Sequence, residues 1–268
     1  MILELEKLTA QVCEVARKAG DYLRKEQQML DRSQVEQKHT HDYVSYVDKC
    51  SEKFIVAELS NILIAGFVTE EGTAQHHGET YWWVIDPLDG TTNYIHGGHP
   101  YAVSIALRNA EEVLLGVVYE VVADECFYAW KGGGSWLNGN PIHVNDRNDI
   151  TQALLGIELP YQTDYKNFGI YLIRHFYGLA GGIRMNGSAA VALCNVASGR
   201  WDGWIEKYIG PWDFMAGLLI VREAGGMITD FQGDENCLEQ NSIVASNGSV
   251  HKELIEKTEK FSFNFLEI

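Results

Sequence analysis

The sequence predicts a mixed α+β and α/β protein, with antiparallel strands in its first half and strand–helix alternation in its second. Three observations predict this fold class. The chain opens with two amphipathic helical patterns, continues with short β segments joined by turns, and then alternates strands with helices. The polar segment 145–151 separates the two halves, so we expect an N-terminal subdomain, 1–147, and a C-terminal subdomain, 148–268.

The first half is expected to contain two helices followed by strands. Apolar residues recur at three- and four-residue steps, which predicts helices over 4–25 and 47–62. The polar stretch between them, 34–43, is expected to be a mobile loop or a hairpin. Predicted strands are 67–69, 81–85, 101–107, 113–121 and 126–130. The glycine-rich segment 131–140 is expected to be a hairpin turn, because no helix follows it as a phosphate-binding loop requires.

The second half shows the periodicity of alternating strands and helices. Short apolar runs predict strands, and longer apolar patterns after Pro, Ser or small residues predict helices. The predicted strands are 153–157, 227–231 and 242–245, and the predicted helices are one in the 160s and 170s and three at 188–197, 211–224 and 250–257.

Composition and charge exclude several classes of function. The 268 residues carry a formal net charge of −16, which argues against nucleic-acid or anionic-membrane surfaces because both require basic patches. The sequence shows no apolar run of membrane-spanning length and no secretory leader. Its five cysteines are scattered and form no C-x-x-C, as expected in a reducing compartment. We therefore expect a cytoplasmic protein.

The most informative segment is an apolar run that breaks into two carboxylates, a proline, a glycine and two threonines. Asp86 and Asp89 stand where the predicted strand ends, so their carboxylates can converge on one hard cation such as Mg²⁺. Gly90 lets the backbone approach a ligand. Thr91 and Thr92 can open a helix whose N-terminus faces an anion. Asp, Pro and Gly are also common in simple turns, which is the alternative interpretation.

Four further positions can contribute to the same site. Glu70 ends a neighbouring predicted strand, which would place its carboxylate beside Asp86 unless it belongs to a surface Glu–Glu pair. Asp213 lies in the first turn of an apolar helix, as a cap or as a further metal ligand. Ser188 precedes another helix whose N-terminus can contact a ligand, and Asp48 begins the second helix. Both of these can equally be plain helix caps.

Together these motifs resemble the inositol monophosphatase family of Mg²⁺-dependent, lithium-sensitive sugar and polyol phosphatases. The resemblance covers nearly the whole chain, and its motifs occur in the family's order and near its spacing. They are Lys38, Asp48, Glu70-Glu71, Asp86 to Asn93, Gly187 to Ala190, Trp212-Asp213, Ala216-Gly217 and Glu223 to Gly226. The resemblance implies a five-layered αβαβα sandwich of the sugar phosphatase type, a homodimer, and competition of Li⁺ with Mg²⁺.

The resemblance also implies roles for individual residues. Two to three Mg²⁺ ions per site would be held by Glu70, Asp86, Asp89, Asp213 and the carbonyl of Leu88. The catalytic residues would be Glu70, Thr91 and Asp48, with the Thr91–Asp48 pair helping to activate the attacking water. The substrate contacts would be Gly90, Thr91, Thr92, Gly187, Ser188, Ala189, Glu206 and Asp213.

The implied reaction is hydrolysis of a small phosphorylated polyol, myo-inositol 1-phosphate first, by metal-activated water. Thr92-Asn93-Tyr94 and Glu206 resemble the inositol branch of the family. The alternatives are fructose 1,6-bisphosphate, 3′-phosphoadenosine 5′-phosphate and histidinol phosphate, or a catalytically silent binding protein on the same fold. A second phosphate would require basic residues, for which Lys207 and Arg184 are the nearby candidates.

Two histidine positions complete the set of candidates. His99 stands where relatives usually carry an aromatic or other residue, and it can contact substrate or pack; packing is favoured. His76 and His77 precede a predicted strand in a polar loop. Adjacent residues rarely converge on a metal without further ligands, so these two are expected to be solvated.

Overall fold

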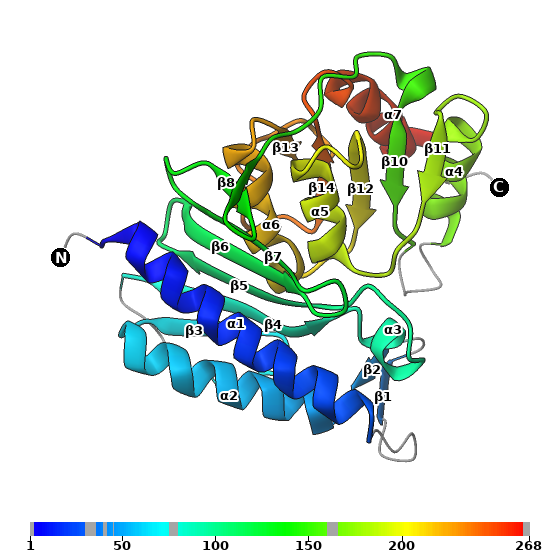
Figure 1. The fold of residues 1–268 in the computed structure, drawn as a ribbon. Coiled ribbons are helices and arrows are strands. Elements are labelled where there is room, and N and C mark those ends of the chain that lie inside the picture. The colour runs from blue at the N-terminus through cyan, green and yellow to red at the C-terminus, as the bar shows by residue number, and fades with distance from the viewer. Residues whose placement is uncertain are drawn as a thin grey trace.

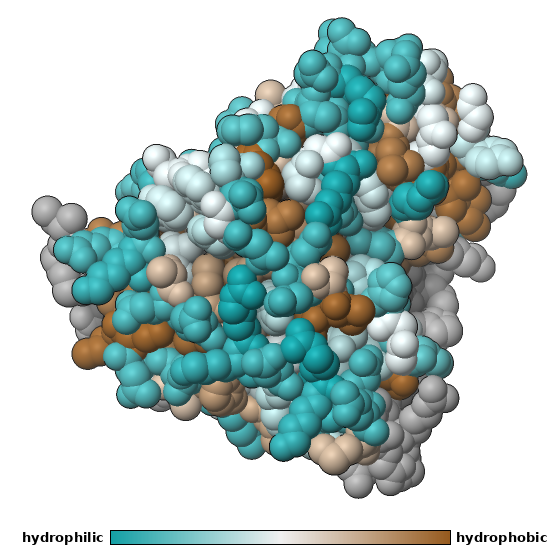
Figure 2. Space-filling model, viewed as in Figure 1, coloured by the Kyte–Doolittle hydropathy of each residue, from teal (hydrophilic) through white to brown (hydrophobic). Residues whose placement is uncertain are grey.

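The computed structural model describes residues 3–29, 36–39, 42–44, 46–74, 80–159 and 166–264. Helices and sheets stack as five layers in the order αβαβα (Figure 1), which confirms the predicted fold class. Among the described residues, no helix is long and apolar enough to cross a membrane. Figure 2 shows hydrophilic residues over most of the face in view, with hydrophobic residues in scattered patches.

The first layer consists of α1 (Leu5–Gln27) and α2 (Tyr46–Ile62), which lie side by side over one face of the first sheet (Figure 1). Both helices are close to their predicted bounds, and their apolar residues are buried against that face. Between them in sequence, β1 (Glu36–His39) pairs with β2 (Asp42–Val44). Of the two predicted alternatives, a loop or a hairpin, the described part of this stretch forms the hairpin.

The first sheet has seven strands in the order β3-β4-β5-β6-β7-β8-β9. They are β3 (Gly66–Thr69), β4 (Trp82–Asp89), β5 (Ala102–Arg108), β6 (Val113–Glu120), β7 (Glu125–Trp130), β8 (Ser135–Leu137) and β9 (Asn140–Ile142). β3 and β4 are parallel, and every other neighbouring pair is antiparallel. The glycine-rich segment is two turns around the short strand β8, because residues 135–137 pair with β7.

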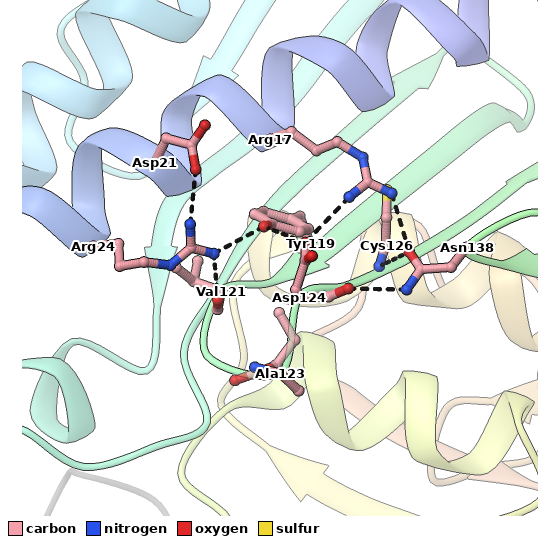
Figure 3. Close-up of polar contacts among 10 residues, drawn as sticks. Arg17, Asp21, Arg24, Tyr119, Val121, Ala123, Asp124, Cys126 and Asn138 are labelled. Atoms are coloured by element: carbon pink, nitrogen blue, oxygen red, sulfur yellow. Dashed lines mark hydrogen bonds and ion pairs between the residues drawn. The ribbon is translucent and has the colours of Figure 1, made fainter.

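Polar contacts tie α1 to the turns at one end of this sheet (Figure 3). Arg17 donates to Asp124 at 3.2 Å and to Asn138 at 3.0 Å, and these two residues lie in the turns that follow β6 and β8. Two turns of helix further, Arg24 donates to the Tyr119 hydroxyl at 3.0 Å. These contacts fix α1 against the first sheet at two positions along the helix.

The middle layer is the helix pair α5 (Ala189–Ala197) and α6 (Pro211–Glu223), which pack against each other between the two sheets (Figure 1). Most of their residues are buried, because a sheet covers each side. Two glycines permit the close approach of α6 to its neighbours. A β-carbon at Gly116, on β6 of the first sheet, would lie 2.5 Å from the carbonyl oxygen of Ala216 on α6, and one at Gly217 on α6 would lie 2.5 Å from Leu193 on α5.

The second sheet has five strands in the order β11-β10-β12-β14-β13. They are β10 (Leu154–Ile157), β11 (Gly182–Arg184), β12 (Gly203–Lys207), β13 (Met227–Thr229) and β14 (Ser242–Ser246). α4 (Lys166–Phe176) and α7 (His251–Asn264) cover its outer face. The sequence did not predict β11 and β12: β11 has only three residues, and β12 contains a glycine beside fully buried apolar residues, which hides any alternation.

The polar segment 145–151 connects the first sheet to the second. Asn145 donates to the carbonyl of Gly199, and Arg147 donates to the buried carboxylate of Asp202 at 3.0 Å. The connection therefore forms hydrogen bonds with the second half of the chain. We propose that the subdomain boundary lies within it, between residues 147 and 148.

Candidate active site

Asp86 and Asp89 lie on the same side of β4 because the strand is irregular between them. Asp86 is opposite Ser104 and Asp89 is opposite Ala102, so β4 has one residue more than β5 across this interval. In a regular strand, residues three positions apart face opposite sides of the sheet. The additional residue makes a β-bulge, which tolerates Pro87 and returns both carboxylates to one side. β4 therefore continues through Asp89 and does not end before Asp86 as predicted.

Three carboxylates form a compact cluster at this bulge. One oxygen from each of Asp86, Asp89 and Asp213 lies within 4.8 Å of the other two. Asp86 and Asp89 are buried, whereas Asp213, in the first turn of α6, is partly exposed. Asp213 also accepts a hydrogen bond from the amide of Gly210 at 2.7 Å. It therefore caps the helix and also joins the cluster, so capping does not exclude the predicted role as a metal ligand.

Glu70 lies beside this cluster. β3 runs parallel to β4 with Thr69 opposite Ile85, and the amide of Glu70 donates to the carbonyl of Ile85 at 3.2 Å. This alignment places the Glu70 carboxyl in hydrogen-bonding contact with Asp86. The structure thus brings together the four acids that the sequence identified as candidate ligands.

Burial and mutual repulsion change the proton affinities of these acids. Burial raises the pKa of Asp86 well above its usual value, and the charges of Glu70, Asp89 and Asp213 raise it further. Burial also raises the pKa of Asp89 to about 6, against the effect of its hydrogen bonds with the start of α5. Buried carboxylates that repel one another are stabilised by a cation. Oxygen donors of this kind fit a hard divalent ion such as Mg²⁺.

The N-terminus of α5 holds Asp89, a contact that the sequence did not predict. The Ser188 hydroxyl donates to Oδ2 of Asp89, and the amide of Ala190 donates to the same oxygen at 2.9 Å. The amide of Ala189 donates to Oδ1 at 3.2 Å. Helix N-termini favour anions, and here the anion is a carboxylate of the same chain. Ser188 also caps the helix by accepting from the amide of Val191.

Ser188→Ala should weaken Mg²⁺ binding about tenfold, because hydrogen-bond partners of metal ligands typically affect affinity to this extent. Isothermal titration of the EDTA-treated protein with Mg²⁺ measures the effect. Ser198→Ala is the matched control: Ser198 lies just past the other end of α5 and donates to the carbonyl of Cys194. Equal affinities in the two variants would show that Asp89 does not depend on Ser188 for binding a metal.

Thr91 and Asp48 meet, as the resemblance implied. Thr91 begins α3 (Thr91–Ile95), and its hydroxyl lies 3.2 Å from Oδ1 of Asp48 and 2.9 Å from the carbonyl oxygen of Leu88. Asp48 is buried in the first turn of α2. Gly90 has φ of +88°, and a β-carbon there would lie 2.8 Å from the carbonyl oxygen of Pro100. Glycine is therefore required by the turn and by the close approach of the chain's own backbone, and the approach of a ligand to Gly90 stays a prediction.

Glu206 is a further acid close to the cluster. It lies on β12, which the sequence analysis did not identify as a strand. Burial raises its pKa well above the usual value, and the charges of Glu158, Asp213 and Asp89 add to the effect. Its Oε2 atom is buried and has no hydrogen-bond partner among the described residues.

Glu158 is a residue that sequence reasoning missed. It directly follows β10 and accepts hydrogen bonds from the amides of Asn186 at 2.8 Å and Gly187 at 3.2 Å. Burial raises its pKa to about 7. Asn93, three residues into the segment that begins at Gly90, donates to the carbonyl of Asn186 at 2.8 Å. The position of Glu158 directly after a buried strand is the same signal that identified Glu70.

Other predicted residues are exposed or are not described in full. His99 is exposed, so the expectation that it packs is wrong. Arg184 is also exposed, at the end of β11. His76 and His77 lie outside the described residues, and the side chain of Lys38 is likewise not described.

Lys207 contacts aromatic rings of the outer core. Its Nζ lies 5.0 Å from the centre of the Tyr208 ring and 5.9 Å from those of Phe168 and Phe231. The last two rings belong to the core cluster between the second sheet and its outer helices. Burial lowers the pKa of Lys207, and the cation is stabilised by the ring faces.

A model of the inositol monophosphatase family matches residues 4–262. The chain belongs to the inositol monophosphatase family. Over 243 residues it is 40% identical to an inositol-1-monophosphatase of Rhizobium meliloti, covering 89% of this chain and 91% of the relative. Over 247 residues it is 39% identical to Nus factor SuhB of Pseudomonas aeruginosa, covering 90% and 91%.

Solved structures of this family share the fold. The extragenic suppressor protein SuhB of Bartonella henselae aligns with a TM-score of 0.88 and 35% identity over 94% of this chain and 98% of its own. The IMPase of Thermotoga maritima aligns with a TM-score of 0.86 and 32% identity over 93% and 96%. The inositol monophosphatase family is a family of phosphatases, so the resemblance inferred from the motifs is confirmed at this level.

Proposed function

We propose that this member of the inositol monophosphatase family hydrolyses a small phosphorylated polyol, myo-inositol 1-phosphate first, to the polyol and phosphate. The observation that carries the proposal is the buried cluster of Asp86, Asp89 and Asp213 beside Glu70. Carboxylates at this spacing, next to a paired hydroxyl and a helix start, provide the parts that metal-assisted phosphate ester hydrolysis requires.

The proposed metal ligands follow from the arrangement of these acids. Glu70, Asp86 and the Leu88 carbonyl would hold a first Mg²⁺, Asp86, Asp89 and Asp213 a second, and Glu70 a weaker third through waters. When bound, the ions would lower the pKa of a coordinated water and offset the charge of the phosphoryl group.

The chain's own residues would orient the reactants. The Thr91 hydroxyl, within hydrogen-bonding distance of Asp48, would accept a hydrogen bond from the attacking water while donating to that carboxylate. The backbone amides of Gly90, Thr91 and Thr92, at the start of α3, would seat the phosphate. Gly187 and the buried start of α5 would form the adjoining wall of the substrate pocket.

Glu206 supports a polyol as the substrate. Its buried Oε2 has no partner among the described residues, and a substrate hydroxyl can donate to it. The two basic residues considered as ligands of a second phosphate are less suitably placed. Lys207 is turned toward aromatic rings, and Arg184 is exposed at the end of β11. These contacts favour a monophosphate over a bisphosphate.

The relative named Nus factor SuhB matches about as well as the relative named inositol-1-monophosphatase. A catalytically silent binding protein on this fold is therefore the second hypothesis. We expect such a protein to have lost at least one ligand of the site. The presence of Glu70 and the three clustered aspartates, together with Thr91 and Asp48, favours hydrolysis.

Phosphate release with Mg²⁺ should be fastest from myo-inositol 1-phosphate within a panel that includes glycerol 2-phosphate, fructose 1,6-bisphosphate, 3′-phosphoadenosine 5′-phosphate and histidinol phosphate. Glu206→Gln should raise the KM for the inositol ester about tenfold, the usual effect of weakening a hydrogen bond to a charged group, and change glycerol 2-phosphate hydrolysis little. Preference for a bisphosphate or for histidinol phosphate would refute the substrate assignment and retain the metal chemistry. Release from none of them would favour the silent protein.

We also propose that Li⁺ competes with Mg²⁺ and that the chain forms a homodimer. Millimolar Li⁺ added to the same assay tests the first property, and light scattering tests the second.

A further inference from the structure

Glu52 is a fully buried carboxylate whose position connects two parts of the site. It lies on α2, one helical turn after Asp48, with no exposed surface. The two side chains therefore project from the same face of the helix. Asp48 contacts Thr91, whereas Glu52 contacts the segment that follows β3 and carries Glu70.

Three donors within residues 69–73, which begin at the last residue of β3, contact the Glu52 carboxylate. Oε1 accepts from the Thr69 hydroxyl at 2.9 Å and from the amide of Thr73 at 2.7 Å. Oε2 accepts from the amide of Glu71 at 2.8 Å. Hydrogen bonds to an ionised acceptor are shorter and stronger than those between neutral groups. The backbone is thereby held on both sides of Glu70.

A second contact from α2 reaches the bulge of β4. The hydroxyl of Ser51 lies 3.3 Å from the carbonyl oxygen of Pro87, between the two clustered aspartates of that strand. One face of α2 therefore contacts the three segments that carry Thr91, the bulge and Glu70. The register of this helix determines how these segments are placed relative to one another.

We propose that Glu52 is a positioning residue that holds Glu70 against Asp86 in the arrangement that receives the metal ion. It acts through the backbone of residues 69–73 and contacts neither the ion nor the substrate. This inference rests on the proposed function, because it assigns Glu70 to the metal site.

Removing the charge of Glu52 should weaken metal binding and leave the affinity for substrate unchanged. In Glu52→Gln, one end of the side chain becomes an N–H donor that faces amide and hydroxyl donors, so at least one of the three hydrogen bonds is lost. We expect the affinity of one site for Mn²⁺ to fall about tenfold. Electron paramagnetic resonance of the EDTA-treated protein, titrated with Mn²⁺ in the absence of substrate, measures this affinity. Half-maximal turnover should require correspondingly more Mg²⁺, with the substrate KM at saturating Mg²⁺ unchanged.

Matched variants separate positioning from a general loss of stability. Thr69→Val removes one donor and should weaken Mn²⁺ binding, whereas Thr69→Ser keeps the hydroxyl and should restore it. Glu58→Gln, on the same helix but paired at the surface with Lys18, should bind Mn²⁺ as the parent does. The threonine pair keeps the test decisive if Glu52→Gln does not fold.

The outcomes distinguish this inference from the proposed function. Parent-like Mn²⁺ affinity in folded Glu52→Gln and Thr69→Val would overturn the positioning role alone. An unmodified protein that binds no Mn²⁺ would overturn the proposed metal site, and with it both proposals.

Discussion

Asp86→Asn should abolish most phosphate release while leaving the metal-free protein at least as stable as its parent. Asp86 is 1% exposed, lies in the three-carboxylate cluster and contacts Glu70, so both proposed principal metal positions depend on it. Asparagine is nearly isosteric, and its Oδ1 can still accept the hydrogen bond that Leu88 donates at 2.9 Å. The substitution thus removes a charge with little change in packing.

The expected decrease in turnover is at least about 100-fold, because the substitution removes a direct ligand and even partners of ligands contribute 10- to 100-fold. Without metal, the same change relieves repulsion among buried carboxylates, so the melting temperature should not fall. Turnover and thermal unfolding after EDTA treatment measure the two effects. Asp149→Asn is the matched control at an exposed helix cap and should keep full turnover. Parent-like turnover in Asp86→Asn would refute the ligand assignment.

The metal-free protein should lose stability as the pH rises from 6.5 to 8.5, and Mg²⁺ should prevent this loss. Burial raises the pKa of Glu158 to about 7 and raises those of Asp86 and Glu206 well above their usual range. In the unfolded chain these groups lose their protons at about pH 4. Across this window the folded state therefore binds more protons than the unfolded state, and stability falls as pH rises.

The test range begins at pH 6.5 because the titration of His251 has the opposite effect on stability at lower pH. Burial lowers the pKa of His251 to about 4, so this histidine costs stability as pH falls below about 6.5, where it is protonated in the unfolded chain. Between its hydrogen-bond partners Thr229 and Ser246, it is neutral throughout the test range.

Thermal unfolding with EDTA and with saturating Mg²⁺, at each pH, tests the prediction. We expect the melting temperature with EDTA to fall by several degrees, since about 1 kcal/mol shifts a domain of this size by a few degrees. The stabilisation by Mg²⁺ should grow with pH, because metal ligands must be deprotonated. Asp86→Asn should show a shallower pH dependence without metal. A melting temperature that rises with pH in EDTA would contradict the proton affinities described for this site.

Several features of the molecule are determined locally and could be predicted from the sequence. α1, α2, α5 and α6 follow from apolar periodicity and from end signals such as Ser188 and Pro211, which act within one or two turns of helix. The acids of the site were also identifiable. Glu70 and Asp86 each follow a buried apolar run on parallel neighbouring strands, so their proximity is a property of strand pairing.

Tertiary structure alone decided how these groups act together. The bulge of β4 depends on pairing with β5, and only that pairing places Asp86 and Asp89 on one side. Asp213 is both cap and cluster member because α6 packs across the first sheet. The contacts of Glu52 and Ser188 with the segments that carry the candidate ligands join residues far apart in sequence, and no local pattern encodes them. Local propensity specifies which elements form, whereas the buried carboxylates acquire their proton affinities and partners only when the layers close around them.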